Sequence, residues 1–294
     1  MIKTIAVLLT CHNRREKTIS CLTSLHDVLD KDSNQLKMDV FLTDDGSTDG
    51  TTLSVAAMFP LVRILKGNGN LFWAGGMRNS WNEALKFNYD AYLLLNDDTN
   101  VSANIFVELM HCDEYAAKKY NSGGIYICST HDDKSDITYG GSVIKSKFFN
   151  TIKRLVPNGH IQECDLGNAN IMLVTRDVIK KIGILSSDYV HGIADFDYCL
   201  TAKKKNIPVL IAANYCGFCH YEHPNTYDKF VKLSFLERKK YLLHPKGLAF
   251  ADSIKFMKKF YPYRVPFIYA VAWLKLFFPN FYVTVNKLRR FAKK

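Results

Sequence analysis

Apolar segments that each end in a polar motif constrain the fold of this chain more than any other feature. Three of them are Ile5–Thr10, Met38–Thr43 and Ala91–Leu95, and each has the length of a β-strand. After the first, Arg15–Leu29 carries apolar residues at the three- and four-residue spacing of an amphipathic helix. Strands that alternate with helices predict an α/β fold, in which helices flank a mostly parallel sheet. Ligands of such sheets bind where the carboxyl ends of the strands open into loops, and the polar motifs lie there.

Further elements of the same kind are expected along the chain. In the N-terminal half they are a strand at Val62–Leu65 and helices at Thr51–Phe59 and Gly75–Phe87. Beyond Gly123 the pattern is less regular. There we expect strands at Ile125–Cys128, Ile137–Val143 and Asn170–Val174, a loop or hairpin at Lys145–His160, helices at Arg176–Ile182 and Asp195–Lys205, and an apolar segment at Ile207–Ile211.

Charge divides the chain into two parts. Residues 229–294 hold 16 Lys and Arg against two acids, whereas residues 1–228 carry a net charge of −3. A duplex-binding protein is expected to place cations around its working cleft, so this separation argues against a nucleic-acid enzyme. We expect a folded body at 1–228 and a separate C-terminal segment at 229–294.

The basic C-terminal segment also holds 16 of the 38 aromatic side chains. Lys, Arg and aromatic rings together favour an anionic membrane surface as the partner. The longest charge-free run, Val265–Leu274, is too short to cross a bilayer, which takes about 20 apolar residues. We expect the segment to lie on a membrane; packing on the core and association into a homo-oligomer are the alternatives.

The first strand is too short to be a secretion signal, and it runs directly into the polar residues Cys11–Arg14. We therefore expect a cytoplasmic protein, peripherally associated with the inner face of the cell membrane. In that compartment the eight cysteines are expected to be reduced thiols.

One cysteine cluster, Cys216–His220, has the C-x-x-C-H spacing of covalent haem attachment. That chemistry takes place outside the cytosol, so we reject the haem interpretation. A structural zinc site is the alternative, with ligands from Cys216, Cys219, His220 and His223.

A Gly-rich and Asn-rich segment, Gly67–Gly76, leads into a helix that carries Arg78. Glycines let the backbone approach a ligand closely, a helix N-terminus favours negative charge, and an Arg side chain makes a forked contact with phosphate. The segment therefore favours a phosphorylated ligand; a tight turn is the alternative. Neither a Walker sequence nor a G-x-G-x-x-G follows the first strand, which argues against a kinase-type ATPase and an NAD enzyme.

Asn96, Asp97 and Asp98 directly follow the third apolar strand. Adjacent carboxylates repel each other unless a cation lies beside them, and Mg²⁺ or Mn²⁺ prefers oxygen ligands. We expect a site for a metal and a diphosphate here. The alternative is that Asp98 or Thr99 caps a helix that begins near Ser102.

A third acidic pair, Asp195 and Asp197, follows Gly192–Ala194. Asp195 either caps the helix that begins there or projects into the cleft as a base. The spacing alone does not decide between these roles.

Five motifs occur in one order along the chain, and together they resemble the family 2 glycosyltransferases with the GT-A fold. The motifs are Val7–Arg14, Thr43–Thr51, Gly69–Asn79, Leu95–Thr99 and Ala194–Leu200. The resemblance covers about Ile5 to His223. Within the family, the Asn70–Gly76 loop and the Asn96–Thr99 turn are most similar to the bacterial rhamnosyltransferase-like branch, which builds surface polysaccharides such as O-antigen or capsule.

The resemblance implies a Rossmann-like GT-A sheet and a nucleotide-sugar site. Residues 1–228 would be the catalytic domain, with a nucleotide-sugar-binding half at 1–100 and an acceptor-binding half at 101–228. Thr10, Asn13 and Asp44 would line the base and ribose, and Arg78 would approach the diphosphate. The full set expected to bind the nucleotide sugar is Thr10, Asn13, Arg14, Asp44, Asp45, Asn70, Trp73, Gly75, Gly76, Arg78, Asn96 and Asp97.

By the same resemblance, Asp98 and His220 would hold Mg²⁺ or Mn²⁺, with His223 as the alternative to His220. Asn96 stands where the first Asp of the family's D-x-D motif usually does. Asp195 matches the catalytic acid of the family's Glu-Asp-x-Asp segment, with Ala194 in place of the Glu, and would act as the base.

The resemblance thus implies a metal-dependent inverting hexosyltransferase. It would move rhamnose or another hexose from a UDP- or dTDP-sugar to a hydroxyl of a lipid-linked bacterial glycan. A nucleotidyltransferase that makes sugar nucleotides is one alternative, disfavoured because no Gly-rich triphosphate loop with Arg and Lys follows the first strand. The other is a membrane-recruited scaffold whose donor site has decayed.

Overall fold

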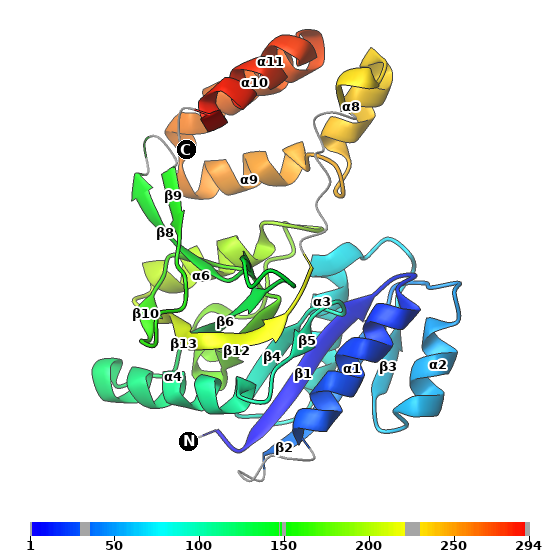
Figure 1. Cartoon of the computed structure of the whole chain (residues 1–294), viewed down its shortest axis with the longest axis vertical. Helices are drawn as coiled ribbons and strands as arrows, with labels where there is room; N and C mark the ends of the chain where they lie inside the picture. Colours follow the sequence, from blue (N-terminus) through cyan, green and yellow to red (C-terminus); the bar gives the residue numbers. More distant parts are fainter. Residues whose placement is uncertain (1, 30–35, 147, 149–150, 221–229, 292–294) are drawn as a thin grey trace. The chain divides into compact units, whose positions relative to one another are not determined.

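The chain forms two compact units in a computed structural model that describes residues 2–29, 36–146, 148, 151–220 and 230–291. The first unit comprises Met1–Ser187 and Ala194–Tyr221, and the second comprises Asp188–Ile193 and Glu222–Lys294 (Figure 1). The domain boundary expected after residue 228 lies among residues 221–229, outside the described residues, and stays a prediction.

A mixed sheet with eight strands along its main path forms the centre of the first unit, in the order β10-β13-β6-β12-β4-β1-β2-β3. β1, β2, β3, β4, β6 and β13 run in one direction, and β12 runs against its neighbours β4 and β6. The expected mostly parallel sheet is therefore confirmed. The strands are β1 (Thr4–Cys11), β2 (Lys37–Asp44), β3 (Arg63–Lys66), β4 (Ala91–Leu95), β6 (Ile125–His131), β10 (Gln162–Glu163), β12 (Ile171–Thr175) and β13 (Val209–Phe218), and the short strands β5 (Asn100–Val101) and β7 (Ile137–Tyr139) pair with β13 and β6.

Helices cover both faces of this sheet because the side chains of β1 alternate between two apolar layers. Ile5, Val7 and Leu9 belong to an apolar cluster with side chains of α1 and α4. Thr10, out of phase with them, meets α3, where a Cβ added to Gly76 would lie 2.0 Å from the Thr10 Oγ1 atom. Figure 1 shows α1 and α3 on opposite sides of the sheet. The helices are α1 (Arg15–Leu29), α2 (Thr51–Met58), α3 (Phe72–Ala84), α4 (Ile105–Tyr120), α5 (Arg176–Ile182) and α6 (Ala194–Lys204).

Some elements differ from the sequence-based expectation. The strand expected at Ile137–Val143 is broken at Gly140, and β8 (Gly141–Ser146) instead pairs with β9 (Thr151–Arg154) and β11 (Leu166–Gly167) in a second, three-stranded sheet. The hairpin alternative for Lys145–His160 is thus the one that forms. The helix expected near Ser102 begins only at Ile105, after β5, so Asp98 and Thr99 do not cap it.

The second unit is helical. Helix α8 (Phe235–Leu243) has a capping box, because the Ser234 hydroxyl accepts from the Glu237 N–H while the Glu237 carboxylate accepts from the Ser234 N–H. Over the described residues, no single helix is long and apolar enough to span a membrane, although Pro262–Phe277 and Pro279–Val285 pass that test together with a bend of 118°. Its elements are α8 (Phe235–Leu243), α9 (Phe250–Phe260), η1 (Pro262–Arg264), α10 (Val265–Phe277) and α11 (Pro279–Phe291).

Candidate functional site

The carboxyl ends of β1, β2 and β4 meet at one edge of the sheet. The three strands are parallel, with Cys11 opposite Asp44 and Leu8 opposite Leu94. The residues that follow each strand therefore lie close together, even though more than 80 positions separate Arg14 from Asp97 in the sequence.

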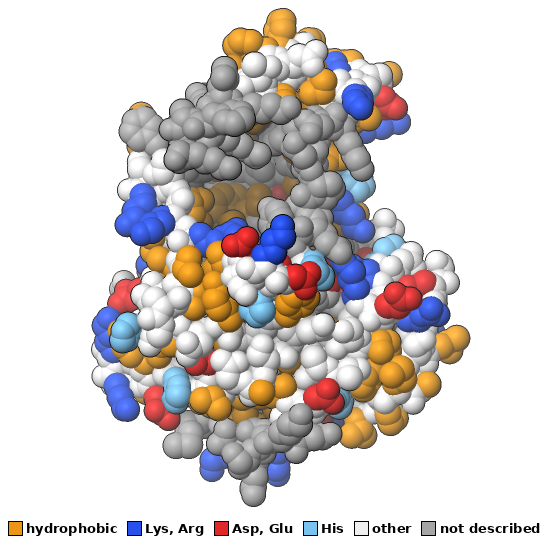
Figure 2. All heavy atoms as spheres, viewed as in Figure 1, with side chains coloured by type: hydrophobic (Ala, Val, Ile, Leu, Met, Phe, Trp, Pro, Cys, Tyr) orange, Lys and Arg blue, Asp and Glu red, His pale blue; other side chains and the backbone are white. Residues whose placement is uncertain are grey.

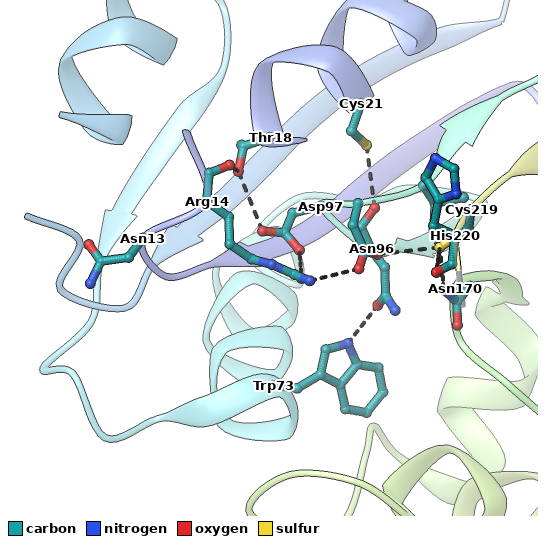
Figure 3. Close-up of polar contacts among 12 residues, drawn as sticks. Asn13, Arg14, Thr18, Cys21, Trp73, Asn96, Asp97, Asn170, Cys219 and His220 are labelled. Atoms are coloured by element: carbon teal, nitrogen blue, oxygen red, sulfur yellow. Dashed lines mark hydrogen bonds and ion pairs between the residues drawn. The ribbon is translucent and has the colours of Figure 1, made fainter. Parts of the chain in front are cut away.

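The side chain of Arg14 bridges the two acids that follow β4. Its Nη1 atom lies 2.8 Å from Asp97 Oδ1 and its Nη2 atom lies 2.9 Å from Asp98 Oδ2 (Figure 3). Asp97 is only 4% exposed, and its second oxygen accepts from the Thr18 hydroxyl at 3.4 Å. The cation that the adjacent carboxylates require is thus supplied, at least in part, by the protein itself.

Burial and this ion pair act on the acids in opposite directions. Burial raises the pKa of Asp97 to about 6, although Arg14 favours the charged carboxylate. Burial disfavours the charge of Arg14, but the two carboxylates outweigh it and raise the pKa of the guanidinium. A buried charge that loses its partner is strongly destabilising, so Arg14 and Asp97 depend on each other.

Asn96 connects the end of β4 to three other elements. Its Oδ1 atom accepts from the Trp73 Nε1–H of α3 at 2.7 Å, and its backbone N–H donates to the Asn170 carbonyl at 3.0 Å. Its own carbonyl accepts from the Cys21 thiol of α1. Figure 3 shows these side chains around the ion pair, whereas Asn13 lies apart from them.

Asp45, the residue after β2, organises the Gly-rich loop. Its Oδ1 atom accepts from the Gly69 N–H at 2.8 Å, and its Oδ2 atom accepts from the Phe72 N–H at 2.9 Å. A Cβ at Gly67 would lie 2.6 Å from Asp45 Oδ1, so only glycine allows this close approach. The carboxylate starts α3 at Phe72, three residues before the expected Gly75, and leaves a loop of five residues, Gly67–Leu71.

Asp44 and Asn13 hold the neighbouring turn. Asp44 accepts from the Ser47 N–H at 2.8 Å and from the Thr52 hydroxyl. The Asn13 Oδ1 atom accepts from the Thr48 N–H at 2.7 Å. These bonds join the loops after β1 and β2, where the base and ribose are expected.

The other residues expected at the nucleotide lie on or next to α3. Gly75 and Gly76 are in its first half, and Thr10 packs against Gly76 at the end of β1. Arg78 Nη1 donates to the Ser186 carbonyl at 2.9 Å, and Asn70 is in the exposed part of the Gly-rich loop.

Asp98 and His220 line the same cavity, of about 140 Å³, which also contains Lys17, Ser20, Asn100 and Phe218. They come together because β13 ends beside β5, where Phe218 pairs with Asn100. His220 is exposed, and its Nδ1 atom lies 3.4 Å from Asp133 Oδ2. One carboxylate and one imidazole fit an ion that takes its other ligands from water and substrate phosphates. His223 is outside the described residues.

The alternative zinc site finds no support in the described part of the chain. There, no group of three His, Cys, Asp or Glu side chains could hold a metal. Cys216 is a fully buried residue of β13, and burial together with Asp98 raises the pKa of Cys219 to about 12. All eight cysteines are buried and free, so the thiols are core residues.

Asp195 lies in the first turn of α6 and is half-buried. Its Oδ1 atom accepts from the Phe196 N–H at 2.8 Å and its Oδ2 atom from the Ala169 N–H at 3.3 Å. Burial raises the pKa of its carboxyl to about 6, against these hydrogen bonds. A carboxyl with a pKa near neutrality is suited to accept a proton at physiological pH.

Ala169 and Asn170 connect the two parts of the site, a role that no motif of the sequence indicates. Ala169 binds Asp195, and the next residue, Asn170, binds Asn96 through its carbonyl. They lie at this edge because β12 is antiparallel, so that it begins where β4 ends. No local sequence signal predicts the reversal. Thr18 and Cys21, in contrast, follow Arg14 at positions four and seven, a helical spacing that could have indicated their shared face.

Comparisons with known proteins identify the fold. The sequence matches no protein-family model and no curated protein. Among solved structures, a mannosyltransferase from Pyrobaculum calidifontis in complex with GDP-Man and Mn²⁺ matches 94% of this chain and 70% of its own, at 13% identity and a TM-score of 0.55. GalNAc-T7 with UDP, GalNAc and Mn²⁺ matches 82% of this chain at 13% identity and a TM-score of 0.54.

A third solved structure, S. aureus TarS 1–349 in complex with UDP, matches 78% of the chain at 14% identity and a TM-score of 0.50. This chain spans 50% of the GalNAc-T7 chain and 62% of the TarS chain. Together these likenesses show that the chain has the GT-A fold.

Substitution of Arg14 by Met is expected to destabilise the protein, because it leaves Asp97 buried without its cation. We expect the free energy of unfolding to fall by about 3 kcal/mol near pH 8. Near pH 5 the loss should be smaller, since Asp97, with a pKa of about 6, is then protonated. Denaturant unfolding at the two pH values measures both.

The matched control for this test is Arg15→Met. Arg15 is exposed, and its Nη1 atom reaches only the Asp49 carbonyl at 3.4 Å. Its loss should change the free energy of unfolding by about 0.5 kcal/mol or less. An equal loss for Arg14→Met at both pH values would contradict the pairing described here.

Proposed function

We propose that this protein is a glycosyltransferase that transfers a sugar from a nucleotide sugar to a hydroxyl group. One observation carries the proposal: at the ligand-binding edge of a GT-A sheet, Ala169 and Asn170 link the half-buried carboxylate of Asp195 to the turn Asn96–Asp98. The arrangement couples a candidate base to a candidate diphosphate site, and sugar transfer requires both.

The donor would be a UDP- or dTDP-sugar that carries rhamnose or another hexose, as in the rhamnosyltransferase-like branch. Two of the similar structures contain UDP and one contains GDP-Man, which supports a nucleotide-sugar donor. Thr10, Asn13 and Asp44 would line the base and ribose beside the joined loops after β1 and β2. Arg14 and Arg78 would act on the diphosphate as fixed positive charges.

A divalent ion, Mg²⁺ or Mn²⁺, would be held by Asp98 and His220, which share one cavity. When bound, such an ion neutralises charge that develops on the departing diphosphate. Two similar structures contain Mn²⁺, which supports a divalent ion as cofactor. Asp97, paired with Arg14, and Asn96, bonded to Trp73, would then hold the turn that carries Asp98.

Asp195 would act as the base of an inverting transfer. The acceptor oxygen forms a bond to the anomeric carbon on the face opposite the nucleotide, and the bond from that carbon to the diphosphate oxygen breaks. The hydroxyl proton passes to the Asp195 carboxylate, and the nucleoside diphosphate leaves as an anion. Backbone N–H groups of Phe196 and Ala169 hold the carboxylate, yet its oxygens keep lone pairs for the proton.

Asp195→Asn is expected to lower kcat by about 10²- to 10⁴-fold, because an amide cannot take the proton. In the wild-type protein, kcat should fall about tenfold per pH unit below pH 6, where the Asp195 carboxyl becomes protonated. Steady-state release of the nucleoside diphosphate measures both effects.

Asp177→Asn is the control, because Asp177 is exposed in the first turn of α5. It should retain wild-type kcat and the same pH profile. If a folded Asp195→Asn protein transferred sugar at the wild-type rate, Asp195 could not be the base.

Chelation tests whether sugar transfer depends on a divalent ion. Thorough treatment with EDTA should abolish transfer, and Mn²⁺ or Mg²⁺ should restore it, whereas Asp98→Asn should raise the ion concentration needed for half-maximal rate. Full activity after chelation would remove Asp98 and His220 from the reaction.

The acceptor would be a growing, lipid-linked glycan, and the C-terminal unit would hold the enzyme at an anionic membrane surface. Large side chains of η1, α10 and α11 are exposed, and the rings of Trp273 and Phe277 stack with centroids 5.2 Å apart. Figure 2 shows hydrophobic side chains at the top of the view, near Lys and Arg side chains. The exposed rings are Tyr263, Phe267, Tyr269, Trp273, Phe277, Phe278 and Phe281.

Vesicle flotation tests this membrane proposal. We expect the full-length protein to float with vesicles that contain phosphatidylglycerol, less so in high salt, and not with pure phosphatidylcholine, because aromatic rings and basic side chains act together. Trp273→Ala combined with Phe278→Ala should weaken binding.

The control is Leu61→Ala, since Leu61 is an apolar side chain of the first unit that is 86% exposed. It should leave flotation unchanged. If the paired Trp273 and Phe278 variant floated as well as wild type, the exposed rings would have another role, such as self-association.

A further inference from the structure

A six-residue segment in front of Asp195 belongs to the C-terminal unit. Asp188–Ile193 groups with the C-terminal helices, although the residues before and after it belong to the first unit. The segment ends directly at Ala194, the first residue of α6, and Asp195 is the next residue. Only one residue, Ala194, therefore separates this segment from the candidate base in the sequence.

Helix α9 holds the backbone of this segment at two points. Lys255 Nζ donates to the Asp188 carbonyl at 2.6 Å, and the Val190 N–H donates to Asp252 Oδ2 at 3.3 Å. Asp252 and Lys255 are three positions apart on α9 and so lie on one face of it. The helix thus donates one hydrogen bond to the segment and accepts one from it. We call this pair of contacts the α9 clamp.

The carboxylate of the α9 clamp is unusual for its surroundings. Only two acids occur in residues 229–294, Glu237 and Asp252, against 16 Lys and Arg. Glu237 closes the capping box of α8. Asp252 is only 6% exposed, although a buried carboxylate is unfavourable unless it is hydrogen-bonded. Its hydrogen bond goes to the segment before α6, and Tyr189 of that segment is 1% exposed.

Between the α9 clamp and α6 the backbone is strained. Ile193 has a φ of +71°, a left-handed conformation that a β-branched residue rarely adopts. Such a conformation persists only where the surrounding structure enforces it. Here the segment is held on one side by Asp252 and Lys255, and on the other side it continues into α6, whose first turn is bound at Ala169.

We propose that Asp252 and Lys255 are positioning residues of the transfer reaction: they hold Asp188–Ile193 so that the first turn of α6 presents Asp195 to the acceptor hydroxyl. The inference rests on the proposed role of Asp195 as the base. A base that is displaced by as little as about 1 Å can lose most of its effect. Loss of a contact that holds the preceding segment is therefore expected to lower kcat. The donor residues lie on other elements and should be unaffected.

Kinetics of full-length variants test the proposal. Asp252→Ala and Lys255→Met should each lower kcat by about tenfold and leave KM for the donor within about twofold of wild type. Asp252→Asn keeps an oxygen that accepts from Val190 and should recover kcat to within about threefold. Lys258→Met, on the same helix at an exposed position, is the control and should match wild type.

Hydrogen–deuterium exchange supplies a readout that needs no activity. Release of the α9 clamp should speed exchange of the amides of Ala194–Cys199 in Asp252→Ala and Lys255→Met, but not in Lys258→Met. Because Lys255 is exposed, its substitution remains informative if Asp252→Ala fails to fold.

Two results would overturn the proposal. One is unchanged exchange in Ala194–Cys199, and the other is faster exchange with wild-type kcat. A protein that releases no nucleoside diphosphate even as wild type would instead contradict the proposed function, while the exchange data would still report whether Asp252 and Lys255 hold the segment.

Discussion

The reversed direction of β12 is the constraint on which the site depends. Every neighbouring strand of the central sheet ends at the ligand-binding edge, but β12 begins there, because it pairs antiparallel with both β4 and β6. Its first residues therefore lie beside the turn that follows β4. Ala169 and Asn170 can bind Asp195 and Asn96 at the same time only because of this reversal.

The protein itself neutralises part of the charge at this edge. Two adjacent carboxylates, one of them buried, are paired with Arg14, and together with the hydrogen bonds of Asn96 these ion pairs hold the turn after β4. Asp45 has a similar function on the other side, where its two oxygens hold the Gly-rich loop and the first residue of α3. The loops of the site are thus positioned by carboxylates that accept from the protein. Asp98 and Asp195 also accept from protein groups, but unlike Asp45 and Asp97 they are only half-buried.

The sequence predicted the parts of the structure that follow from local patterns. Segments such as Ile5–Thr10 and Ala91–Leu95 are apolar enough to be predicted as strands without knowledge of their partners. Their alternation with helices predicts a mostly parallel sheet with polar motifs at one edge. The start of α3 was predicted three residues late, because the hydrogen bond that starts it comes from Asp45, 27 positions away. The break at Gly140 and the length of β13 likewise depend on pairing with distant strands.

Contacts over long sequence distances also explain which interactions of the site the sequence does not predict. The expectation that Arg14 binds the nucleotide sugar stays a prediction; the sequence does not indicate that its side chain pairs with acids 83 and 84 positions away. No spacing rule reveals that Asp188–Ile193 contacts a helix that is 62 to 67 positions further along the chain. The roles of Asp98, His220 and Asp195 in transfer remain predictions that the fold makes reasonable.

The most direct test of the account is a screen of nucleotide sugars with the full-length protein, Mn²⁺ and a hydroxyl acceptor such as a lipid-linked saccharide, in which release of the nucleoside diphosphate is measured. We predict turnover of a UDP- or dTDP-sugar that depends on the acceptor, with inversion at the anomeric carbon of the product. Pyrophosphate formation from a nucleoside triphosphate and a sugar phosphate, with no turnover of any nucleotide sugar, would contradict it.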